Sequence, residues 1–377
     1  MKNIEITTVM PCLNEEKSVG KCVKEAQKTL LRFGYSFEII VVDNGSSDKS
    51  AEAAKRAGAK IIKEKVKGYG SALKCGISRA KGKYIVICDC DGTYDFAVIP
   101  EMTVELKRGA GLVLASRFKG KIHPGAMPYV RRYLGNPLLT FMLNLFYGTR
   151  IRDAQTGMRA FTKESYAKLN MKSNGMEFAS EMIIKAIYHK LKITEIAVNY
   201  YKRMGVSKLS PVSDAWRHIK YMLLYSPTYT FIFPGLIFFV SGIVFSIVLL
   251  SGGRRIFGWF FDIHTMTVAI LSGNLGLQLI LFGIFARSYT SDILGLPPGP
   301  LAEIFLKLFT PSRMLLTGMA FFISGLSVIL PVSYFWIISD FGNLFKIREF
   351  IFAVGVGTIG TQLIYSSFLL SLFQGER

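Results

Sequence analysis

The sequence predicts an α/β domain with a mostly parallel sheet, followed by a transmembrane domain of four helices. Two observations lead to this fold class. Short apolar segments rich in β-branched residues alternate with helical segments over residues 1–118, which is the pattern of a parallel α/β sheet. Long apolar stretches without charged residues then occupy most of residues 229–373, and such stretches are typical of membrane spans.

The individual elements of the first part follow from their periodicity and end signals. We expect strands at Ile4–Met10, Glu38–Val42, Lys60–Ile62, Lys83–Cys88 and Leu112–Ala115. We expect helices at Glu16–Phe33, from Ser47-Asp48 to Ala57, and at Ser71–Ala80. Parallel sheets bind ligands at the carboxyl ends of their strands. The polar residues at 43–44, 89–91 and 116–117 all follow predicted strands, so we expect them at that edge.

Two further segments are apolar but too short to cross a bilayer. Leu138–Phe146 is either a core helix or a helix that rests against the membrane. In residues 213–225, Trp216, Ile219 and Leu223 lie on one helical stripe among basic residues. A basic amphipathic helix with a tryptophan suits the membrane interface.

Four stretches reach the length of about 20 residues that a helix needs to cross a bilayer. They are Tyr229–Leu250, Thr265–Ala286, Met314–Ile338 and Phe350–Phe373. We therefore expect the α/β domain over residues 1–212, an interface helix over 213–228 and a transmembrane domain over 229–377. The basic segment Lys202–Lys220 places the first domain in the cytoplasm, and we expect a multi-pass protein of the cell membrane. We expect no internal repeat.

The formal net charge of +20 lies almost entirely in residues 1–225, because the remainder is nearly balanced. With a membrane region next to it, such a basic domain favours phosphorylated substrates and anionic lipid as partners rather than nucleic acid. All five cysteines lie in the same part of the chain, and their count is odd. Small buried thiols explain them better than a metal site or disulfides.

The strongest chemical motif is Asp89-Cys90-Asp91, directly after a buried apolar strand. In extended backbone, side chains two residues apart point to the same side. Both carboxylates can then reach one divalent cation, and Mg²⁺ or Mn²⁺ prefers such oxygen ligands. A cation at Asp91 that also binds a diphosphate would stabilise the charge on a departing nucleoside diphosphate.

Other residues suit the remaining parts of a nucleotide-sugar. Asp43 can accept hydrogen bonds from a nucleobase or ribose, and Glu15 is a weaker candidate for the same role. Arg117 and Arg203 are suited to bidentate phosphate binding. A glycine turn at Gly68–Ser71 is followed by Leu73, so the dinucleotide fingerprint is missing and a dinucleotide oxidoreductase is excluded.

Together these residues resemble family 2 glycosyltransferases of the Rossmann-like GT-A fold, and among them the polyprenyl-phosphate hexosyltransferases such as dolichyl-phosphate mannose and glucose synthases. The resemblance covers nearly the whole chain. It rests on the blocks Pro11–Glu15, Asp43–Ser46, Asp89–Asp91, Ser116-Arg117, Asp153–Arg159 and Arg203–Lys208.

The resemblance implies the following roles. Asp89, Asp91 and Arg117 are catalytic. The nucleotide-sugar is bound by these three and by Pro11, Leu13, Glu15, Val42, Asp43, Cys90, Arg203 and Lys208. The acceptor phosphate meets Arg117 together with Arg131 or Arg132. Asp89 and Asp91 bind Mg²⁺ or Mn²⁺. Thr93 stands where several relatives have a glutamine ligand, so the third ligand is open.

The implied reaction is transfer of a hexose, from UDP-glucose or GDP-mannose, to dolichyl or undecaprenyl phosphate with inversion of the sugar. Asp153 could orient the sugar or the acceptor, or serve only the structure. The sequence leaves the oligomeric state open.

One alternative function is that of a processive polysaccharide synthase, but no tryptophan follows Gln155 and Arg159 as the motif of those enzymes requires. The other is a flippase or transporter with a degenerate transferase domain, for which intramembrane charges are expected.

Overall fold

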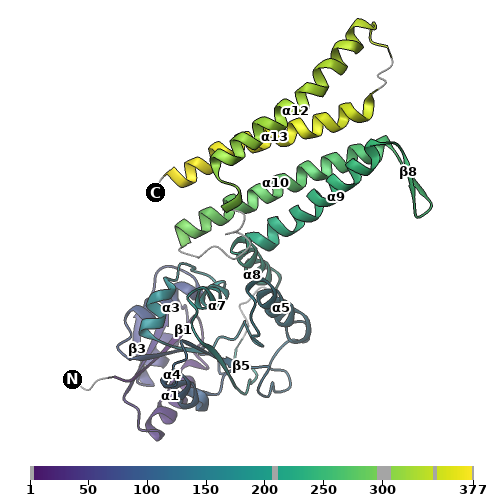
Figure 1. The fold of residues 1–377 in the computed structure, drawn as a ribbon. Helices are drawn as coiled ribbons and strands as arrows, with labels where there is room; N and C mark the ends of the chain where they lie inside the picture. Colours follow the sequence, from purple (N-terminus) through teal and green to yellow (C-terminus); the bar gives the residue numbers. More distant parts are fainter. Residues whose placement is uncertain (1–3, 206–210, 295–306, 343–345, 376–377) are drawn as a thin grey trace. The chain divides into compact units, whose positions relative to one another are not determined.

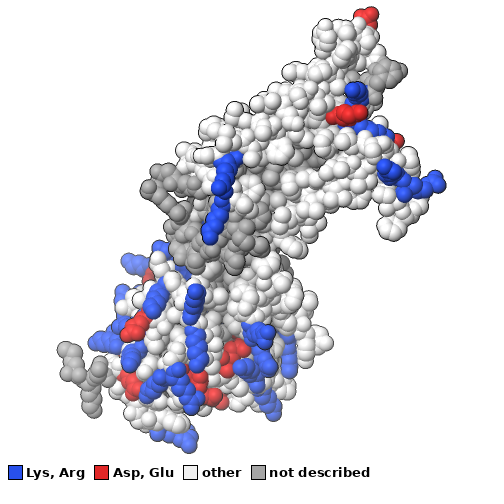
Figure 2. Space-filling model, in the orientation of Figure 1, with Lys and Arg blue, Asp and Glu red and all other residues white. Residues whose placement is uncertain are grey.

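The computed structural model describes residues 4–205, 211–294, 307–342 and 346–375. The chain forms two compact units, Met1–Met222 and Leu223–Arg377 (Figure 1). Figure 2 shows lysine and arginine side chains spread over the visible face of the first unit, whereas the spans of the second are nearly free of charge in this view. This division agrees with the charge distribution of the sequence.

Unit 1 contains a seven-stranded sheet with the order β3-β2-β1-β4-β6-β5-β7. Its strands are β1 Ile6–Cys12, β2 Phe37–Asp43, β3 Lys60–Lys63, β4 Tyr84–Ile87, β5 Leu112–Ser116, β6 Arg159–Thr162 and β7 Ile193–Ala197. Only β6 runs antiparallel to its neighbours β4 and β5, and the other pairs are parallel. The mostly parallel α/β sheet predicted from the sequence is confirmed. The strands β6 and β7 were not predicted.

Helices of unit 1 pack through apolar faces, as α1 illustrates. In α1, Val19, Val23, Ala26 and Leu30 are buried, and this spacing forms one stripe of an α-helix. The unit 1 helices are α1 Val19–Arg32, α2 Ser50–Arg56, α3 Tyr69–Ser78, α4 Ile99–Lys107, α5 Asn136–Tyr147, α6 Lys163–Leu169, α7 Phe178–Tyr188 and α8 Pro211–Leu224, with the short turns η1 Phe96–Val98 and η2 Arg131–Gly135.

Helix α5 has two apolar faces. Leu139 and Leu143 are buried in unit 1, at 5% and 0% exposure. On another side of η2 and α5, Val130, Leu134, Leu138, Phe141 and Leu145 stay exposed by 46–65%. A helix that belonged only to the core would not leave such a stripe in water. The alternative of a helix that contacts the membrane therefore fits the structure better than the core-helix alternative.

Helix α8 packs onto α7 through a buried histidine. The Nδ1 atom of His218 lies 2.9 Å from the hydroxyl of Ser180, and His218 is 5% exposed. Burial, with a smaller contribution from the charge of Arg159, lowers the pKa of His218 from its ordinary 6.5 to about 4. The side chain is therefore neutral in the folded protein at pH 7.

We expect unit 1 to lose stability as the pH falls below 6.5. The unfolded chain protonates His218 below that pH, whereas the folded chain resists protonation down to about pH 4. The stabilisation is complete above the unfolded pKa and is lost below it, by about 2 kcal/mol at pH 5. Denaturant unfolding of the full chain in detergent at pH 7 and pH 5 measures this loss. His218→Gln should flatten the pH dependence, whereas His189→Gln, at an exposed position, should not. Equal slopes in the two variants would contradict the assignment to His218.

Unit 2 consists of long apolar helices and one small hairpin. Among the described residues, four helices are long and apolar enough to cross a membrane: Thr228–Leu250, Ile263–Ser288, Pro311–Ile338 and Ile347–Leu372. The predicted four-helix transmembrane region is thereby confirmed. The elements are η3 Thr228–Ile232, α9 Phe233–Leu250, β8 Arg254–Ile256, β9 Trp259–Phe261, α10 Ile263–Leu294, α12 Pro311–Ile338 and α13 Ile347–Gly375.

Candidate active site

The predicted site residues that follow β2, β4 and β5 lie at one edge of the sheet. Asp43 ends β2, Asp89 follows β4 by two positions, and Arg117 follows β5. Strands β2 and β4 are parallel through β1, and β5 has the same direction because β6 is antiparallel to both β4 and β5. The carboxyl ends of these strands therefore share an edge, which is where α/β sheets bind ligands.

Asp91 is held in place by its own loop and by an arginine. The hydroxyl of Thr93 donates to Asp91 Oδ1 at 2.6 Å, and the backbone N–H of Thr93 donates to the same oxygen at 3.1 Å. The other carboxylate oxygen, Oδ2, lies 3.3 Å from Nη1 of Arg203. In this arrangement Thr93 positions Asp91, and its role as a third metal ligand stays a prediction.

Asp89 lies close to Asp91 in a partly buried position. Burial, followed by the negative charge of Asp91, raises the pKa of Asp89 to about 7. A loop also presses on this carboxylate. A Cβ atom added to Gly157 would overlap Asp89 Oδ2 and lie 3.0 Å from its carboxyl carbon. Glycine at 157 therefore allows the loop to pass directly over the Asp89 side chain.

We expect Gly157→Ala to displace Asp89 and lower transfer. The added methyl group cannot share the space of the carboxylate, and a shift of about 1 Å in a catalytic group costs on the order of 100-fold in rate. The measurement is kcat/KM in detergent, together with the unfolding midpoint. Gly20→Ala serves as the control, because its Cβ would meet nothing closer than 3.6 Å. Wild-type kcat/KM in Gly157→Ala would show that the Asp89 position is unimportant.

The chemistry of Asp89 and Asp91 fits a divalent cation. Each carboxylate is an oxygen donor of the kind that Mg²⁺ and Mn²⁺ prefer, and the unfavourable charge of the pair, which raises the pKa of Asp89, is relieved by a cation. The described residues contain no cluster of three or more His, Cys, Asp or Glu side chains that would complete a metal site. The remaining ligands would come from water and substrate phosphates.

Arg203 links two predicted parts of the nucleotide-sugar site. It forms ion pairs with Glu15 and with Asp91, although 188 positions separate it from Glu15 in the sequence. Backbone bonds fasten its segment to the Asp91 loop: Tyr201 donates to the Thr93 carbonyl at 2.8 Å and Met204 donates to the Asp91 carbonyl at 3.1 Å. Lys208, predicted to act beside Arg203, lies outside the described residues.

Arg117 is fixed by Asp153 in a bidentate ion pair. Its Nε and Nη2 atoms each lie 2.7 Å from an oxygen of Asp153, and its backbone N–H donates to Asp153 Oδ2 at 2.9 Å. The guanidinium also lies 5.3 Å from the ring centre of Tyr200. The side chains of this ion pair are 8% and 0% exposed. The guanidinium keeps further N–H donors for an anion, because two of its five N–H groups suffice for this pair.

The remaining residues predicted at the nucleotide lie around β1 and β2. Asp43 Oδ1 accepts from the N–H of Ser46 at 3.0 Å, which fixes the carboxylate at the strand end. The thiol of Cys90 donates to the Pro11 carbonyl at 3.1 Å, so the Asp89–Asp91 loop is tied to β1. Val42 is fully buried in the sheet, whereas Leu13 is 39% exposed.

The framework roles of two residues, Asn44 and Arg159, were not predicted. Asn44 joins the strand end to the turn before α3: its amide donates to the Glu64 and Val66 carbonyls and its oxygen accepts from Gly68. Asp153, expected either to orient the sugar or the acceptor or to serve only the structure, pairs with Arg117 and so has at least the structural role. Arg159, 1% exposed, donates to the carbonyls of Ala154, Thr156 and Ala179 and so shapes the loop above Asp89. The position of Asn44 directly after Asp43 was the available signal.

Arg131 and Arg132 lie in η2, beside the exposed apolar stripe and not at the strand ends. No ion pair or hydrogen bond joins either of them to Asp89, Asp91 or Arg117 in the described part of the chain. Arg132 lies over its neighbour Tyr133, 5.2 Å from the ring centre. Their predicted contact with an acceptor phosphate stays a prediction.

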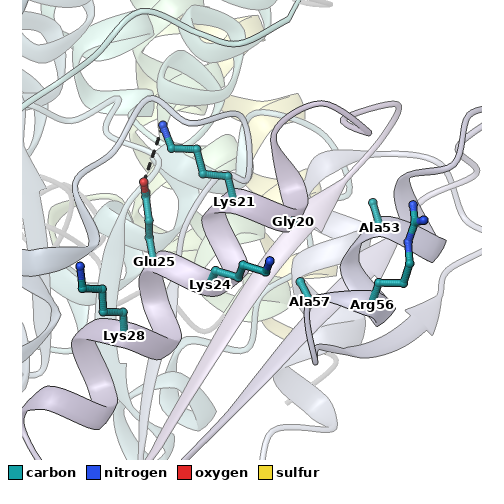
Figure 3. Close-up of a pocket in the computed structure, with 8 residues that line it drawn as sticks. All are labelled: Gly20, Lys21, Lys24, Glu25, Lys28, Ala53, Arg56 and Ala57. Carbon is teal, nitrogen blue, oxygen red and sulfur yellow. Dashed lines mark ion pairs between the residues drawn. The ribbon is translucent and has the colours of Figure 1, made fainter.

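A basic groove of about 500 Å³ lies between α1 and α2 (Figure 3). Lys21, Lys24, Lys28 and Arg56 line it, and Lys21 pairs with Glu25 at 3.7 Å. None of the predicted site residues lines this groove. The predicted site residues therefore lie at the sheet edge and not in this groove.

Comparison with known proteins gives matches across both units. Residues 7–169 match the family described as Glycosyl transferase family 2, and residues 284–374 match its C-terminal transmembrane region. The low-salt glycan biosynthesis hexosyltransferase Agl6 of Haloferax volcanii is 35% identical, over 97% of this chain and 88% of that protein.

Two further relatives match about half of the chain. A dolichyl-phosphate hexose transferase of Haloferax volcanii is 28% identical over 55% of this chain and 87% of its own length. A dolichyl-phosphate beta-glucosyltransferase of Drosophila melanogaster is also 28% identical, over 55% of this chain and 70% of its own length. With a relative that is similar along almost its entire length, this chain belongs to family 2 of the glycosyltransferases, as a membrane enzyme with the C-terminal transmembrane region of that family.

Proposed function

We propose that this enzyme transfers a hexose from a nucleotide-sugar to a polyprenyl phosphate at the cytoplasmic face of the membrane. The single observation that carries the proposal is the arrangement of Asp89, Asp91, Arg117 and Arg203 at one sheet edge. Two carboxylates suit a cation and two guanidiniums suit phosphates. The activities for which the hexosyltransferase and dolichyl-phosphate relatives are named support the same substrate classes.

The donor half of the proposed site lies between β1, β2 and β4. Glu15 and Asp43 would accept hydrogen bonds from the nucleoside, with Pro11, Leu13, Val42 and Cys90 around it. Arg203 pairs with Glu15 and Asp91 in the structure described here. A bound diphosphate would compete with these carboxylates for the guanidinium, so donor binding would exchange one set of charge-assisted hydrogen bonds for another. UDP-glucose is the preferred donor and GDP-mannose the second.

Asp89 and Asp91 would hold the divalent cation. Bound there, Mg²⁺ or Mn²⁺ would neutralise charge on the diphosphate as it departs. The protein itself contributes the positions of the two carboxylates: Thr93 fixes Asp91, and the loop at Gly157 fixes Asp89. With Lys208 and the arginines, these residues hold the leaving group in place.

The proposed acceptor removes the need for a strong catalytic base. A phosphate monoester has a second pKa of about 6, so it carries close to two negative charges at pH 7. One of its oxygens would attack the anomeric carbon while the bond from that carbon to the diphosphate breaks and its electron pair leaves with the diphosphate. Attack from the opposite side inverts the sugar. Arg117, with Arg131 or Arg132, would orient the acceptor phosphate.

The surface of η2 and α5 supports a lipid acceptor. Its exposed apolar stripe has the spacing of one helical face, and Arg131 and Arg132 lie on the same element. Trp216 on α8 is also exposed, at 61%, with Arg217 and Lys220 beside it. Apolar side chains flanked by cations bind the interface of anionic membranes. Unit 1 would thereby meet a phosphate that is anchored in the bilayer.

A donor screen tests the proposal. Membranes that contain the enzyme are incubated with dolichyl or undecaprenyl phosphate and radiolabelled UDP-glucose or GDP-mannose, and lipid-linked label is counted. We expect label from one donor, complete loss of transfer with EDTA, and recovery with Mg²⁺ or Mn²⁺. Full transfer in EDTA would refute the cation, and label in a polysaccharide instead of the lipid would refute the acceptor.

A further inference from the structure

The two helical hairpins of unit 2 carry the same sequence motifs. Helices α9 and α12 share Gly-x-x-Phe-Phe-x-Ser-Gly, at 235–242 and at 318–325. Helices α10 and α13 share Ala-x-x-x-Gly-x-x-Gly-x-Gln-Leu-Ile, at 269–280 and at 353–364. The motifs occur in the same order in both hairpins. The glycines alone would be common in packed membrane helices, but the phenylalanines, the serine and the Gln-Leu-Ile triplet are not needed for close packing.

Equivalent glycines make equivalent contacts in the two hairpins. A Cβ atom on Gly235 would lie 2.9 Å from the Gly276 carbonyl oxygen and 3.0 Å from the Ile280 nitrogen. A Cβ atom on Gly318 would lie 2.9 Å from the Gly360 carbonyl oxygen and 2.9 Å from the Ile364 nitrogen. The contacted residues correspond as well, because Gly276 matches Gly360 and Ile280 matches Ile364 in the second motif.

The same correspondence holds farther along the line of contact between the two helices of each hairpin, which we call the seam. A Cβ atom on Gly242 would lie 2.5 Å from the Ala269 carbonyl oxygen. A Cβ atom on Gly325 would lie 2.8 Å from the carbonyl oxygen of Ala353, the residue equivalent to Ala269. In both hairpins the backbones of the two helices therefore touch with no side chain between them, at the same places.

We infer that unit 2 is a tandem duplication of one helical hairpin, with α9–α10 as the first copy and α12–α13 as the second. Two independent features, the motif order and the contacts between equivalent residues, coincide along four helices. Successive spans cross the membrane in alternating directions. The copies begin with the first and the third span, so they have the same direction in the membrane. The expectation of no internal repeat is therefore replaced. The copies meet through α10 and α13, where Leu277, Leu281 and Leu363 belong to one apolar cluster.

Exchange of the motifs tests the duplication. In the full-length enzyme, residues 318–325 and 353–364 are replaced by the sequences of 235–242 and 269–280. Because these segments occupy equivalent seams, we expect a monodisperse protein in detergent with the wild-type unfolding midpoint. The control inserts the first segment one position later, at 319–326, which rotates its glycines by about 100° around the helix. We expect this control to aggregate or to unfold at a much lower temperature.

The outcome is decisive in either direction and independent of catalysis. If the in-register exchange fails as badly as the shifted one, the two seams are not equivalent and the duplication is refuted. Gly276→Leu and Gly360→Leu give a second comparison, since a Cβ on either glycine would meet the backbone nitrogen of Phe239 or Phe322 well inside 3.0 Å. Equal losses of the unfolding midpoint support equivalence, and tolerance of only one substitution contradicts it.

A separate observation concerns the loop ends of the two hairpins. The β8–β9 hairpin joins α9 to α10, and Phe257 at its turn is 98% exposed, Trp259 74% and Phe260 64%. Phe257 also has a φ of 51°, a left-handed conformation that bulky residues rarely adopt. At the same end of the second copy, Tyr334 and Phe335 are 63% and 65% exposed. We call these five aromatic residues the aromatic collar.

The two loop ends are joined to each other. Arg348, at the start of α13, forms an ion pair with Asp262 just before α10 and donates to the Leu249 carbonyl at 3.1 Å. The hairpin begins at Arg254, close after the end of α9 at Leu250, and ends at Phe261 next to the start of α10. Its strands of three residues reach only about 10 Å. The aromatic collar therefore cannot extend far from the ends of the spans.

We propose that the aromatic collar lies in the headgroup layer of the bilayer, at the ends of α9 and α12 that follow their motifs. The amphipathic rings of Trp259 and Tyr334 favour this layer, and the phenylalanine rings can bury their apolar surface at its boundary with the acyl chains. Exposed Arg254 and Arg255 supply positive charge for anionic lipid headgroups. Lipid contact also explains why the turn places phenylalanine at a strained position, where water would favour glycine or asparagine.

Tryptophan fluorescence tests the location of the collar. Trp216→Phe with Trp336→Phe leaves Trp259 as the only tryptophan of the chain. In vesicles of phosphatidylcholine and phosphatidylglycerol, we expect blue-shifted emission that is quenched by lipids brominated near the headgroup and little affected by iodide. The variant that keeps only Trp216, which the proposed function also places at the membrane interface, gives the positive reference. Emission from Trp259 like that of tryptophan in water, quenched by iodide and not by brominated lipid, would overturn the proposal.

Discussion

Asp91→Asn is expected to lower transfer by about three orders of magnitude while leaving the fold intact. Asparagine keeps an oxygen that can accept the two hydrogen bonds from Thr93, at 2.6 and 3.1 Å in the native protein. The substitution removes only the negative charge that would hold the cation and that pairs with Arg203. Loss of such a charge in a preorganised site costs on the order of 100- to 1,000-fold or more in rate.

The measurement is kcat/KM for lipid-linked transfer, with the unfolding midpoint as the test of folding. Thr93→Val gives the matched comparison, because it removes the hydroxyl that holds Asp91 but keeps the charge. We expect a smaller loss in Thr93→Val than in Asp91→Asn. A larger loss in Thr93→Val would indicate that the hydroxyl, and not the Asp91 charge, dominates. Undiminished transfer in Asp91→Asn would remove the carboxylate pair from the mechanism.

Asp153→Asn is expected to destabilise unit 1 by about 3–5 kcal/mol, which is the usual cost of leaving one member of a buried ion pair without its partner. Arg117 and Asp153 are 8% and 0% exposed, and their bond is 2.7 Å long. Asparagine has the same shape as aspartate but cannot match the charge of the guanidinium. Transfer should also fall, because Arg117 would no longer be fixed at the proposed phosphate position.

The chain contains a control for this second substitution. Arg108 and Glu105 form an ion pair of nearly the same length, 2.8 Å, but with Arg108 69% exposed. Exposed pairs contribute between about 0 and 1 kcal/mol, so Glu105→Gln should leave the unfolding free energy almost unchanged. Chemical unfolding of both variants in detergent measures the difference. Equal effects would mean that burial of the Arg117–Asp153 pair does not matter.

The position of the site at the edge of the sheet could be predicted because its residues lie next to strand ends in the sequence. Each of Asp43, Asp89 and Arg117 follows an apolar strand within two positions, and the rule for ligand sites in α/β sheets then brings them together. The fold class follows in the same way from alternation and from the length of the spans. The antiparallel strand β6 was missed because Arg159–Thr162 is too short to show a period.

The partners of these residues could not be predicted. Arg117 meets Asp153 across 36 positions, and Arg203 meets Glu15 across 188. No periodic pattern connects residues so far apart, and several arginines were equally good candidates for each carboxylate. The roles of Thr93 and Gly157 also depend on a close approach of loops. The repeat in unit 2 could not be predicted from hydrophobic periodicity, because the shared residues are confined to two short segments in each hairpin.

The choice of acceptor tests the central claim most directly. The purified enzyme in vesicles is given the labelled donor that the screen selects, with either a polyprenyl monophosphate or the corresponding polyprenol, which ends in a hydroxyl group. The proposed site orients a phosphate with arginines and relies on the charge that this phosphate already carries. We predict label on the monophosphate, released with inverted configuration, and none on the polyprenol. Transfer to the polyprenol at a comparable rate would contradict the account.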